Sequence, residues 1–261
     1  MIGAAGRMGR ALVRAIDAHA ETTLAAATER AGAAEIGADA GSLAGLGERG
    51  VAISADPAVF ADCAAVLDFT SPATSTALAA TLAGLGVAHV VGTTGFDVAQ
   101  DAAFAEEARR IPIVKSGNMS LGVNMLAALV KEAARALPMA DIEVVEMHHR
   151  RKVDAPSGTA LLLGEAAAAG RGIALREHAV MSREGHTGAR QEGTIGFATL
   201  RGGTVIGEHQ VVMALDKERV ILGHIAEDRD VFANGAVTAA LWLKGRPAGL
   251  YSMRDVLGLA D

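Results

Sequence analysis

The sequence contains almost no cysteine. Cys63 is the single one among 261 residues, so no intrachain disulfide can form, which is typical of proteins from a reducing compartment. No apolar run approaches the roughly 20 residues of a membrane span. The chain also lacks an opening cationic segment followed by an apolar run, as a signal peptide would have. We therefore expect a cytoplasmic protein with no membrane partner.

Aromatic residues are scarce, at 3% of the chain, and the formal net charge is −6. A net acidic chain with few aromatic side chains is a poor nucleic-acid binder, so no nucleic-acid partner is expected. The chain has neither a His-x-x-x-His pair nor a cysteine cluster, which argues against a metal site. Four scattered histidines are interpreted as structural: His178, His186, His209 and His224.

Apolar runs and helical periodicity alternate along the first half of the chain. Strands are expected over 23–28, 51–54, 64–69, 88–91 and 111–115, and helices over 7–20, 75–85 and 97–109. Alternation at this spacing predicts an α/β fold with a doubly wound, parallel, Rossmann-type sheet.

The second half has longer extended segments joined by short connections. Strands are expected over 141–147, 193–200, 205–214 and 219–226, with a tight hairpin at Arg201-Gly202-Gly203, and helices over 123–136 and from Ser157. This pattern predicts a second, α+β domain on a mixed or antiparallel sheet. A helix over 232–243 is expected to return to the first domain. The predicted domains are 1–118 with 229–261, and 119–228.

A glycine-rich segment, Gly3-Ala4-Ala5-Gly6-Arg7-Met8-Gly9, opens the first helix. Glycines at such a place let the backbone approach a pyrophosphate at the helix N-terminus. Glu29 follows Gly9 at the end of the next expected strand, where an acidic side chain can bind a ribose diol. Arg30 is either a receptor for a 2′-phosphate or a plain exposed arginine. The pattern predicts a dinucleotide site, although the middle glycine of the usual motif is replaced by Ala5.

Polar turns follow three successive strands of the predicted parallel sheet. They are Phe69-Thr70, Gly92-Thr93-Thr94 and Ser116-Gly117-Asn118-Met119. Each could be only a turn, because Gly, Thr, Ser and Asn favour turns. Ligands of open parallel sheets bind beyond the carboxyl ends of the strands, so three such turns favour a cofactor crevice.

The segment from Glu146 to Ala160 holds the densest group of reactive side chains. Five potentially cationic residues, His148 to Lys152, lead to a helix start marked by Pro156 and Ser157. Taken alone, the run is a solvated, charged turn. Two histidines, a lysine and a helix start that offers N–H groups to an anion instead favour a substrate site with proton transfer.

These motifs, in this order, resemble the 4-hydroxy-tetrahydrodipicolinate reductase family along nearly the whole chain. The resemblance rests on residues 3–10, Glu29-Arg30, Asp68-Phe69-Thr70, 92–96, 118–124, 146–160 and 232–236. It implies NAD(P)H-dependent reduction of a small cyclic dicarboxylate in lysine biosynthesis through diaminopimelate. The ring would lose water, receive a hydride and be protonated as an enamine. A cytoplasmic homotetramer is implied as well.

The resemblance also assigns roles to individual residues. His148 would be the acid–base residue and Lys152 a proton donor. The substrate would be bound by His149, Ser157, Gly158 and Thr159, with Thr94 closing the site from the cofactor side. NADH or NADPH would be bound by Gly3, Ala4, Ala5, Gly6, Arg7, Met8, Glu29, Arg30, Phe69, Gly92, Thr93, Thr94, Ser116, Gly117, Asn118, Met119, Arg229 and Phe232.

The chain departs from the family at its start, where only Met1 and Ile2 precede Gly3. A strand of about five residues is usual in such sheets. We therefore expect that the recorded start lies within the first strand, and that the glycine loop is weakly anchored or displaced.

Two alternatives remain from the residues alone. One is another two-domain nicotinamide enzyme, such as a semialdehyde or homoserine dehydrogenase. Semialdehyde dehydrogenases need a nucleophilic cysteine, and Cys63 precedes a strand rather than a helix start. The other is an NAD(H)-binding redox sensor, which would not need the histidine and lysine cluster.

Overall fold

The computed structural model describes residues 1–259, which form two compact units. Unit 1 comprises Met1–Leu121 together with the chain from Asp230 onward, and unit 2 comprises Gly122–Arg229. The chain passes into unit 2 after residue 121, three residues later than predicted, and returns to unit 1 after residue 229, one residue later than predicted. Unit 1 is thus built from two segments far apart in the sequence, whereas unit 2 is one continuous segment.

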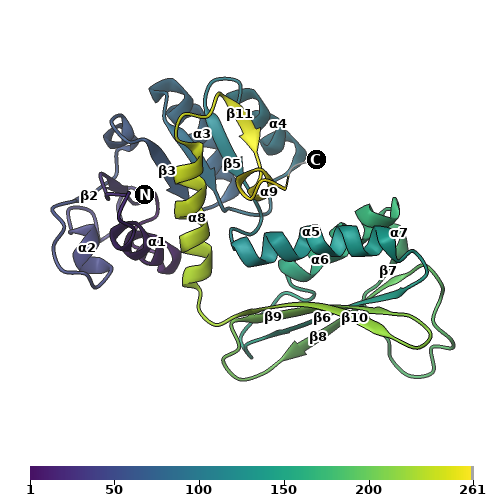
Figure 1. The fold of residues 1–261 in the computed structure, drawn as a ribbon. Helices are drawn as coiled ribbons and strands as arrows, with labels where there is room; N and C mark the ends of the chain where they lie inside the picture. The colour runs from purple at the N-terminus through teal and green to yellow at the C-terminus, as the bar shows by residue number, and fades with distance from the viewer. Residues whose placement is uncertain (260–261) are drawn as a thin grey trace. The chain divides into compact units, whose positions relative to one another are not determined.

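A parallel sheet forms the centre of unit 1, with the strand order β11-β5-β4-β3 (Figure 1). Its strands are β3 (Ala65–Asp68), β4 (Ala88–Val91), β5 (Pro112–Lys115) and β11 (Gly249–Tyr251). A second parallel pair consists of β1 (Ala27–Thr28) and β2 (Ile53–Ser54). The strand expected over 23–28 is therefore regular only at its last two residues.

Met1 and Ile2 lie between the two groups of strands. The Ile2 backbone N donates to Leu67 O at 3.2 Å, and Thr28 N donates to Met1 O at 2.9 Å. These two residues thus continue the parallel hydrogen bonding from β3 to β1. The expected displacement of the glycine loop is not observed, because Gly6 N donates to Gly3 O at 3.1 Å and helix α1 begins at Arg7.

Helices cover both faces of the unit 1 sheet, as the doubly wound prediction requires. Helices α1 (Arg7–Ala18) and α8 (Asp230–Leu243) share one core with Leu67, Val90 and Val114. Helices α3 (Pro72–Leu85) and α4 (Val98–Glu107) share another with Val66, Val91 and Ile113. Neighbouring strand residues enter opposite cores because successive side chains of a strand point to opposite faces. The short elements are α2 (Ala40–Leu43), η1 (Pro57–Phe60) and α9 (Met253–Val256).

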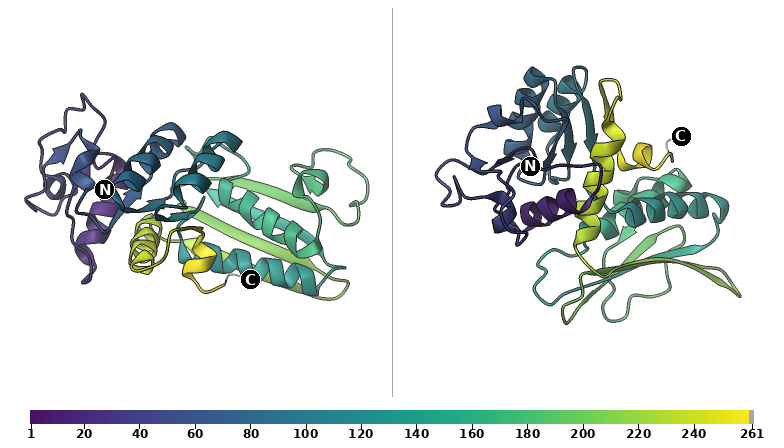
Figure 2. Two further views of the ribbon diagram at one scale, coloured as in Figure 1. Left: turned by 90° about the horizontal axis from the view of Figure 1, so that it is seen from above. Right: turned by 60° about the vertical axis from the view of Figure 1, so that its left-hand side comes forward.

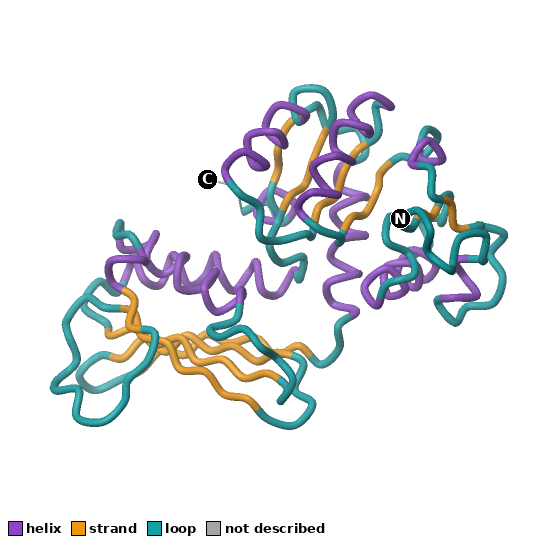
Figure 3. The backbone as a smooth tube through the Cα atoms, turned by 180° about the vertical axis from the view of Figure 1, so that it is seen from behind, coloured by secondary structure: helices purple, strands orange, loops and turns teal. Residues whose placement is uncertain are grey.

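Unit 2 is a mixed sheet with the strand order β10-β9-β6-β8-β7. Helices α5 (Leu121–Ala136) and α6 (Gly158–Arg171) lie side by side on one face, and no described helix covers the other (Figures 2 and 3). The strands are β6 (Asp141–His148), β7 (Ala179–Val180), β8 (Ile195–Arg201), β9 (Gly207–Ala214) and β10 (Arg219–Ala226), and α7 spans Leu175–His178. The mixed α+β domain predicted for this half is confirmed.

The hairpin predicted at Arg201-Gly202-Gly203 is wrong. Strands β8 and β9 do not pair with each other, because β6 lies between them, parallel to β8 and antiparallel to β9. The connection passes around the end of β6, where Gly202 N donates to His148 O at 2.9 Å and His149 N donates to Val205 O at 2.7 Å. Gly202 and Gly203 thus lie in a wide turn whose backbone forms hydrogen bonds with the end of the central strand, β6.

Candidate functional site

The glycine loop of unit 1 is shaped for close backbone packing. Gly3 has a φ of +70°, and a Cβ on Gly9 would lie 2.0 Å from Gly3 O, so neither position accepts a side chain without strain. Helix α1 has no side-chain hydrogen bond at its N-cap, Gly6, and no acidic residue in its first turn. The N–H groups of Arg7 and Met8 at this helix start therefore suit an anion.

Glu29 and Arg30 follow β1 at the edge of the same loop. The Glu29 carboxylate accepts hydrogen bonds from the backbone N of Ala5 at 3.1 Å and of Arg30 at 3.0 Å. The Arg30 side chain is exposed. The loop and this acid, which the sequence predicted to act together, are thus in direct contact.

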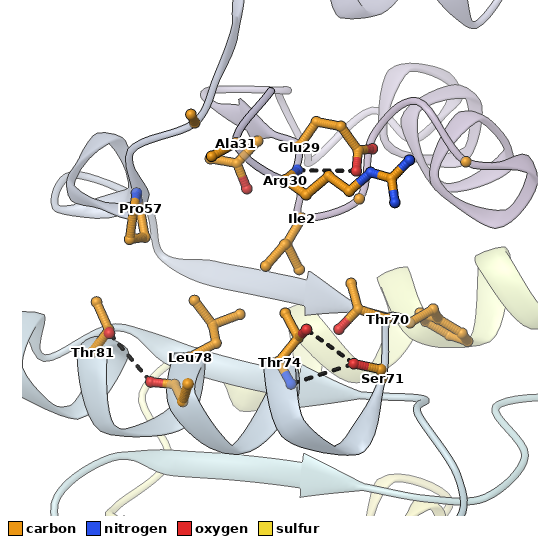
Figure 4. A pocket seen from close by; sticks show the side chains of 16 residues that line it. Ile2, Glu29, Arg30, Ala31, Pro57, Thr70, Ser71, Thr74, Leu78 and Thr81 are labelled. Atoms are coloured by element: carbon orange, nitrogen blue, oxygen red, sulfur yellow. Dashed lines mark hydrogen bonds between the residues drawn. The ribbon is translucent and has the colours of Figure 1, made fainter. Parts of the chain in front are cut away.

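A cavity of about 620 Å³ opens beside these residues. Figure 4 shows Glu29 and Arg30 on one side of it and Ser71, Thr74 and Leu78 of the α3 region on the other. Thr28 Oγ1 in its wall is buried and has no hydrogen-bond partner among the described residues. A glycine loop, an uncapped helix start, an acidic side chain and an unsatisfied hydroxyl fit the pyrophosphate and ribose of a dinucleotide.

A buried acid organises the turns that follow β3 and β4. Asp68 is fully buried, and its Oδ1 accepts from Thr70 N at 3.0 Å and Thr70 Oγ1 at 2.7 Å, while Oδ2 lies 3.1 Å from His89 Nε2. Thr93 Oγ1 lies 3.5 Å from Oδ1. The Phe69 ring packs on Gly92, where a Cβ would meet it at 2.2 Å. Two of the three predicted turns are therefore held together by one carboxylate.

The third predicted turn follows β5. Ser116 N donates to Val91 O at 3.1 Å, and Gly117 lies beside the methyl group of Thr94. Asn118 Oδ1 accepts from Ser120 N at 2.8 Å. The side chain of Met119 is buried in the core, so only its backbone is available to a ligand. The three turns predicted to line the crevice are thus neighbours in unit 1, and Phe232 lies in α8 of the same unit.

In unit 2 the charged run after β6 separates into two groups. Arg150 and Arg151 are exposed, as the solvated-turn interpretation expects. His148 is buried, with 8% of its surface exposed, and Lys152 is half-buried, with its Nζ 2.8 Å from Asp154 Oδ1. The two residues predicted to transfer protons are therefore sheltered, as is His149 between them.

His148 belongs to a buried polar network. Its Nδ1 lies 2.6 Å from Glu146 Oε2, and its ring meets that of His209 edge-on, with centroids 5.1 Å apart. Burial lowers the pKa of His148, and the Glu146 carboxylate offsets this only in part. Burial lowers the pKa of His209 to about 4, so His209 is neutral near pH 7.

The start of α6 joins this network through Ser157. Its Oγ accepts from Ala160 N at 3.1 Å, which caps the helix, and lies 2.9 Å from His209 Nε2. Gly158 and Thr159 form the first turn of α6, where backbone N–H groups point out of the helix end. This helix start, residues 157–159, is the one that the sequence predicted to offer N–H groups to an anion, and we call it the anion seat. Hydrogen bonds of Ser157 to Glu146 and His209 link it to the network that contains His148.

His149 and Arg229 lie together in unit 2. Arg229 Nη2 is 3.3 Å from His149 Nε2, and His149 Nδ1 is buried without a partner among the described residues. Because arginine is always a donor, His149 Nε2 is the acceptor in this contact, and Nδ1 is the ring nitrogen left to donate.

Three residues of the unit 2 network were missed from the sequence: Glu146, Arg201 and His209. Glu146 could have been found, because strand alternation places it on the same face as His148. His209 was interpreted as structural. Nothing in the local sequence links it, or Arg201 at the end of β8, to this site.

We call the glycine loop of residues 3–9, together with Glu29, the dinucleotide cradle. A doubly wound unit that holds such a cradle is joined here to an α+β unit with a buried histidine, a lysine and an anion seat. This combination is typical of two-domain, nicotinamide-dependent oxidoreductases. The chain matches the family descriptions "Dihydrodipicolinate reductase, N-terminus" over residues 1–119 and "Dihydrodipicolinate reductase, C-terminus" over residues 122–257. It belongs to the dihydrodipicolinate reductase family, also called the 4-hydroxy-tetrahydrodipicolinate reductase family. The members of this family are NAD(P)H-dependent oxidoreductases of lysine biosynthesis through diaminopimelate.

Two relatives bear the name 4-hydroxy-tetrahydrodipicolinate reductase. The first, from Mesorhizobium japonicum, is 59% identical over 100% of this chain and 96% of its own length. The second, from Methylocella silvestris, is 60% identical over 99% of this chain and 96% of its own length. A solved structure, dipicolinate-bound dihydrodipicolinate reductase from Paenisporosarcina sp. TG-14, has the same fold. Its TM-score is 0.77 at 21% identity, with 97% of each chain covered.

Proposed function

We propose that this chain reduces (2S,4S)-4-hydroxy-2,3,4,5-tetrahydrodipicolinate to 2,3,4,5-tetrahydrodipicolinate with NADH or NADPH and loss of water. The observation that carries the proposal is the buried His148 beside the start of α6. It combines a proton-transfer group with N–H groups that can hold a carboxylate. Neither a redox sensor nor a thiol-dependent dehydrogenase has a use for this combination.

Unit 1 is the proposed dinucleotide-binding domain and unit 2 the proposed substrate domain. The backbone of residues 3–8, with Glu29 and the strand-end turns, would hold the cofactor, which supplies a hydride when bound. The N–H groups of Gly158 and Thr159, with Ser157 and His149, would hold the ring carboxylates. Because His148 Nδ1 faces Glu146, its proton would move through Nε2. Lys152 would supply positive charge and the proton for the enamine carbon.

Glu29 and Arg30 should affect the affinities for NADH and NADPH differently. We expect Arg30→Ala to weaken NADPH about 10-fold or more and NADH little, because a guanidinium meets only the 2′-phosphate. Glu29→Ala should weaken NADH more than NADPH, since the diol loses its acceptor. Fluorescence titration of each variant with both cofactors measures the Kd values. Equal losses for both cofactors in each variant would contradict the assignment.

We further propose that the chain works as a cytoplasmic homotetramer, without nucleic-acid or membrane partners. None of the described helices has the length and apolarity needed to cross a bilayer. The uncovered face of the unit 2 sheet exposes Leu200, Ile221 and Ile225 by 50%, 56% and 63%. Cross-strand register gives one row in the order Leu200, Met147, Glu208 and Ile225. An uncovered sheet face that exposes apolar side chains beside polar ones suits a symmetric contact with a second copy.

Sedimentation equilibrium tests the tetramer. The expected mass is four times the 26.5 kDa of the chain. Ile225→Glu and Leu200→Glu should each lower it, because a buried carboxylate without a partner is costly at an interface. Val98→Glu is the control, since Val98 is 87% exposed on α4 of unit 1. A monomeric wild-type chain, or tetramers of both glutamate variants, would refute this part of the proposal.

A further inference from the structure

Glu146 is a buried acid of unit 2 whose carboxylate has four hydrogen-bond donors around it. Only 1% of its surface is exposed, and each carboxylate oxygen has two partners. Oε2 faces His148 Nδ1 at 2.6 Å and Arg201 Nη1 at 2.8 Å. Oε1 accepts from Ser157 N at 3.0 Å and Arg201 Nη2 at 2.9 Å. A carboxylate has about four lone-pair sites, so this one is saturated.

The bonds of Glu146 determine which nitrogen of His148 carries a proton. Burial would raise the pKa of Glu146, but hydrogen bonds from Arg201, His148 and Ser157 outweigh it and lower the pKa. The ionised carboxylate accepts only, so His148 Nδ1 must be the donor. His148 Nε2 then remains for chemistry. Nε2 lies against Gly207, and a Cβ atom at position 207 would be only 3.1 Å from it.

The same carboxylate also fixes the loop that leads to the anion seat. Its Oε1 holds the backbone of Ser157, the N-cap of α6. Arg201 Nη2 donates both to Oε1 and to Asp154 O, the latter at 2.7 Å. The segment from His148 to Ser157 is therefore tied at its first, seventh and last residues to one ion pair.

We propose that Glu146, clamped by Arg201, is the positioning residue that sets both the tautomer of His148 and the place of the anion seat. The inference rests on the proposed function of His148. Replacing Glu146 by Gln keeps the shape but leaves four donors facing one amide oxygen. Of these donors only His148 can become an acceptor, so the amide oxygen stays with Ser157 N and Arg201 Nη2 and the amide NH₂ faces His148 Nδ1. The His148 ring is then driven to the tautomer with its proton on Nε2.

The groups facing His148 give the direction of the pH effect. They are Glu146, Lys152, Arg201 and His209. Of these, only Glu146 raises the pKa of His148. Loss of the Glu146 charge should therefore lower the pKa of His148. The limb of the pH profile of kcat/KM on which protonated His148 is required should then shift to lower pH. A merely structural role would leave this limb in place.

The test compares Glu146→Gln with Glu143→Gln in the full chain. Glu143 also pairs with an arginine, Arg183, through two bonds of 2.8 and 2.9 Å, but lies on the opposite face of β6. Glu146→Gln should lower kcat on the order of 10²-fold, shift the pH limb downward and change the ¹⁵N NMR signature of His148 from Nδ1–H to Nε2–H. Glu143→Gln should leave the limb and the tautomer unchanged.

Arg201→Lys separates the two roles and serves if Glu146→Gln does not fold. Lysine keeps the charge but cannot bridge both oxygens and Asp154 O. We expect KM for the dicarboxylate to rise about 10-fold with the tautomer of His148 retained. An unchanged KM would overturn the link to the anion seat.

His148→Gln distinguishes this inference from the proposed function. Wild-type turnover in that variant would refute the catalytic role of His148, whatever its tautomer. Slow turnover in His148→Gln, combined with a wild-type pH limb and an Nδ1–H signature in Glu146→Gln, would overturn the positioning role alone.

Discussion

Replacement of His148 by Gln should lower kcat by roughly 10²–10⁴-fold, the range of a positioned acid–base group. Lys152→Gln should have an effect of the same range, because the side chain supplies both charge and a proton. The binding of NADH should barely change in either variant, since both residues belong to unit 2 and the dinucleotide cradle belongs to unit 1. Loss of NADH absorbance with freshly generated substrate measures the rates, and fluorescence titration measures binding.

Arg151→Gln is the matched control for these two variants. Arg151 lies in the same charged run but is exposed, so its removal lowers the local charge without touching the sheltered groups. Turnover in this variant should stay near the wild-type value. Wild-type turnover in both His148→Gln and Lys152→Gln would show that the proton-transfer roles are assigned to the wrong residues.

The second large effect is expected from Asp68. Asp68→Ala leaves His89 buried without its carboxylate and removes the acceptor of Thr70. A buried donor left without its acceptor costs about 1–3 kcal/mol, and His89 and Thr70 both lose theirs, so unit 1 should unfold at clearly lower denaturant concentration. The fluorescence of Trp242, the single tryptophan, reports this transition because it lies in α8 of unit 1. Cofactor affinity should fall as well, because the turns after β3 and β4 lose their common anchor.

The pH dependence of this stabilisation has a definite sign. Burial would raise the pKa of Asp68, but hydrogen bonds with His89, Thr70 and Ser75 outweigh it, and the pKa is lowered from 3.8. A carboxyl with a lowered pKa in the folded state stabilises the fold above its unfolded pKa, and this stabilisation is lost as pH falls. The difference between wild type and Asp68→Ala should thus be full above about pH 4 and shrink below it.

Asp101→Asn is the control for Asp68→Ala. Asp101 pairs with Lys115 at 2.7 Å but is 55% exposed. Exposed pairs contribute about 0–1 kcal/mol, so the midpoint should hardly move. Equal shifts in the two variants would contradict the importance assigned to the buried pair.

The periodicity of apolar residues predicted the helices and strands that bury one or both of their faces in a regular pattern. Strands β4 and β10 have the predicted bounds, because each is a run of apolar or alternating residues bounded by turns. The strand expected over 23–28 failed for the opposite reason, since most of its residues do not pair. β11 was missed because three residues carry no recognisable period.

Long-range pairing explains the errors in unit 2. The turn at Arg201-Gly202-Gly203 has the composition of a hairpin, and no local signal shows that β6 inserts between β8 and β9. The same limit hid Arg201, which reaches Glu146 from a strand 55 residues further along. The residues that the sequence brought out best, such as His148 and Glu29, are those whose neighbours along the chain already define their role.

The discontinuous construction of unit 1 bears on the order in which the protein folds during synthesis. Unit 2 is complete once Arg229 has been made, whereas the core of unit 1 still lacks Ala233, Ala236 and Val237 of α8 and the edge strand β11. Domains fold as units, so we expect the sheet face that α8 covers to stay incomplete in residues 1–121 until the last segment leaves the ribosome. The segment of unit 1 that is made before unit 2 should therefore reach its final packing after it.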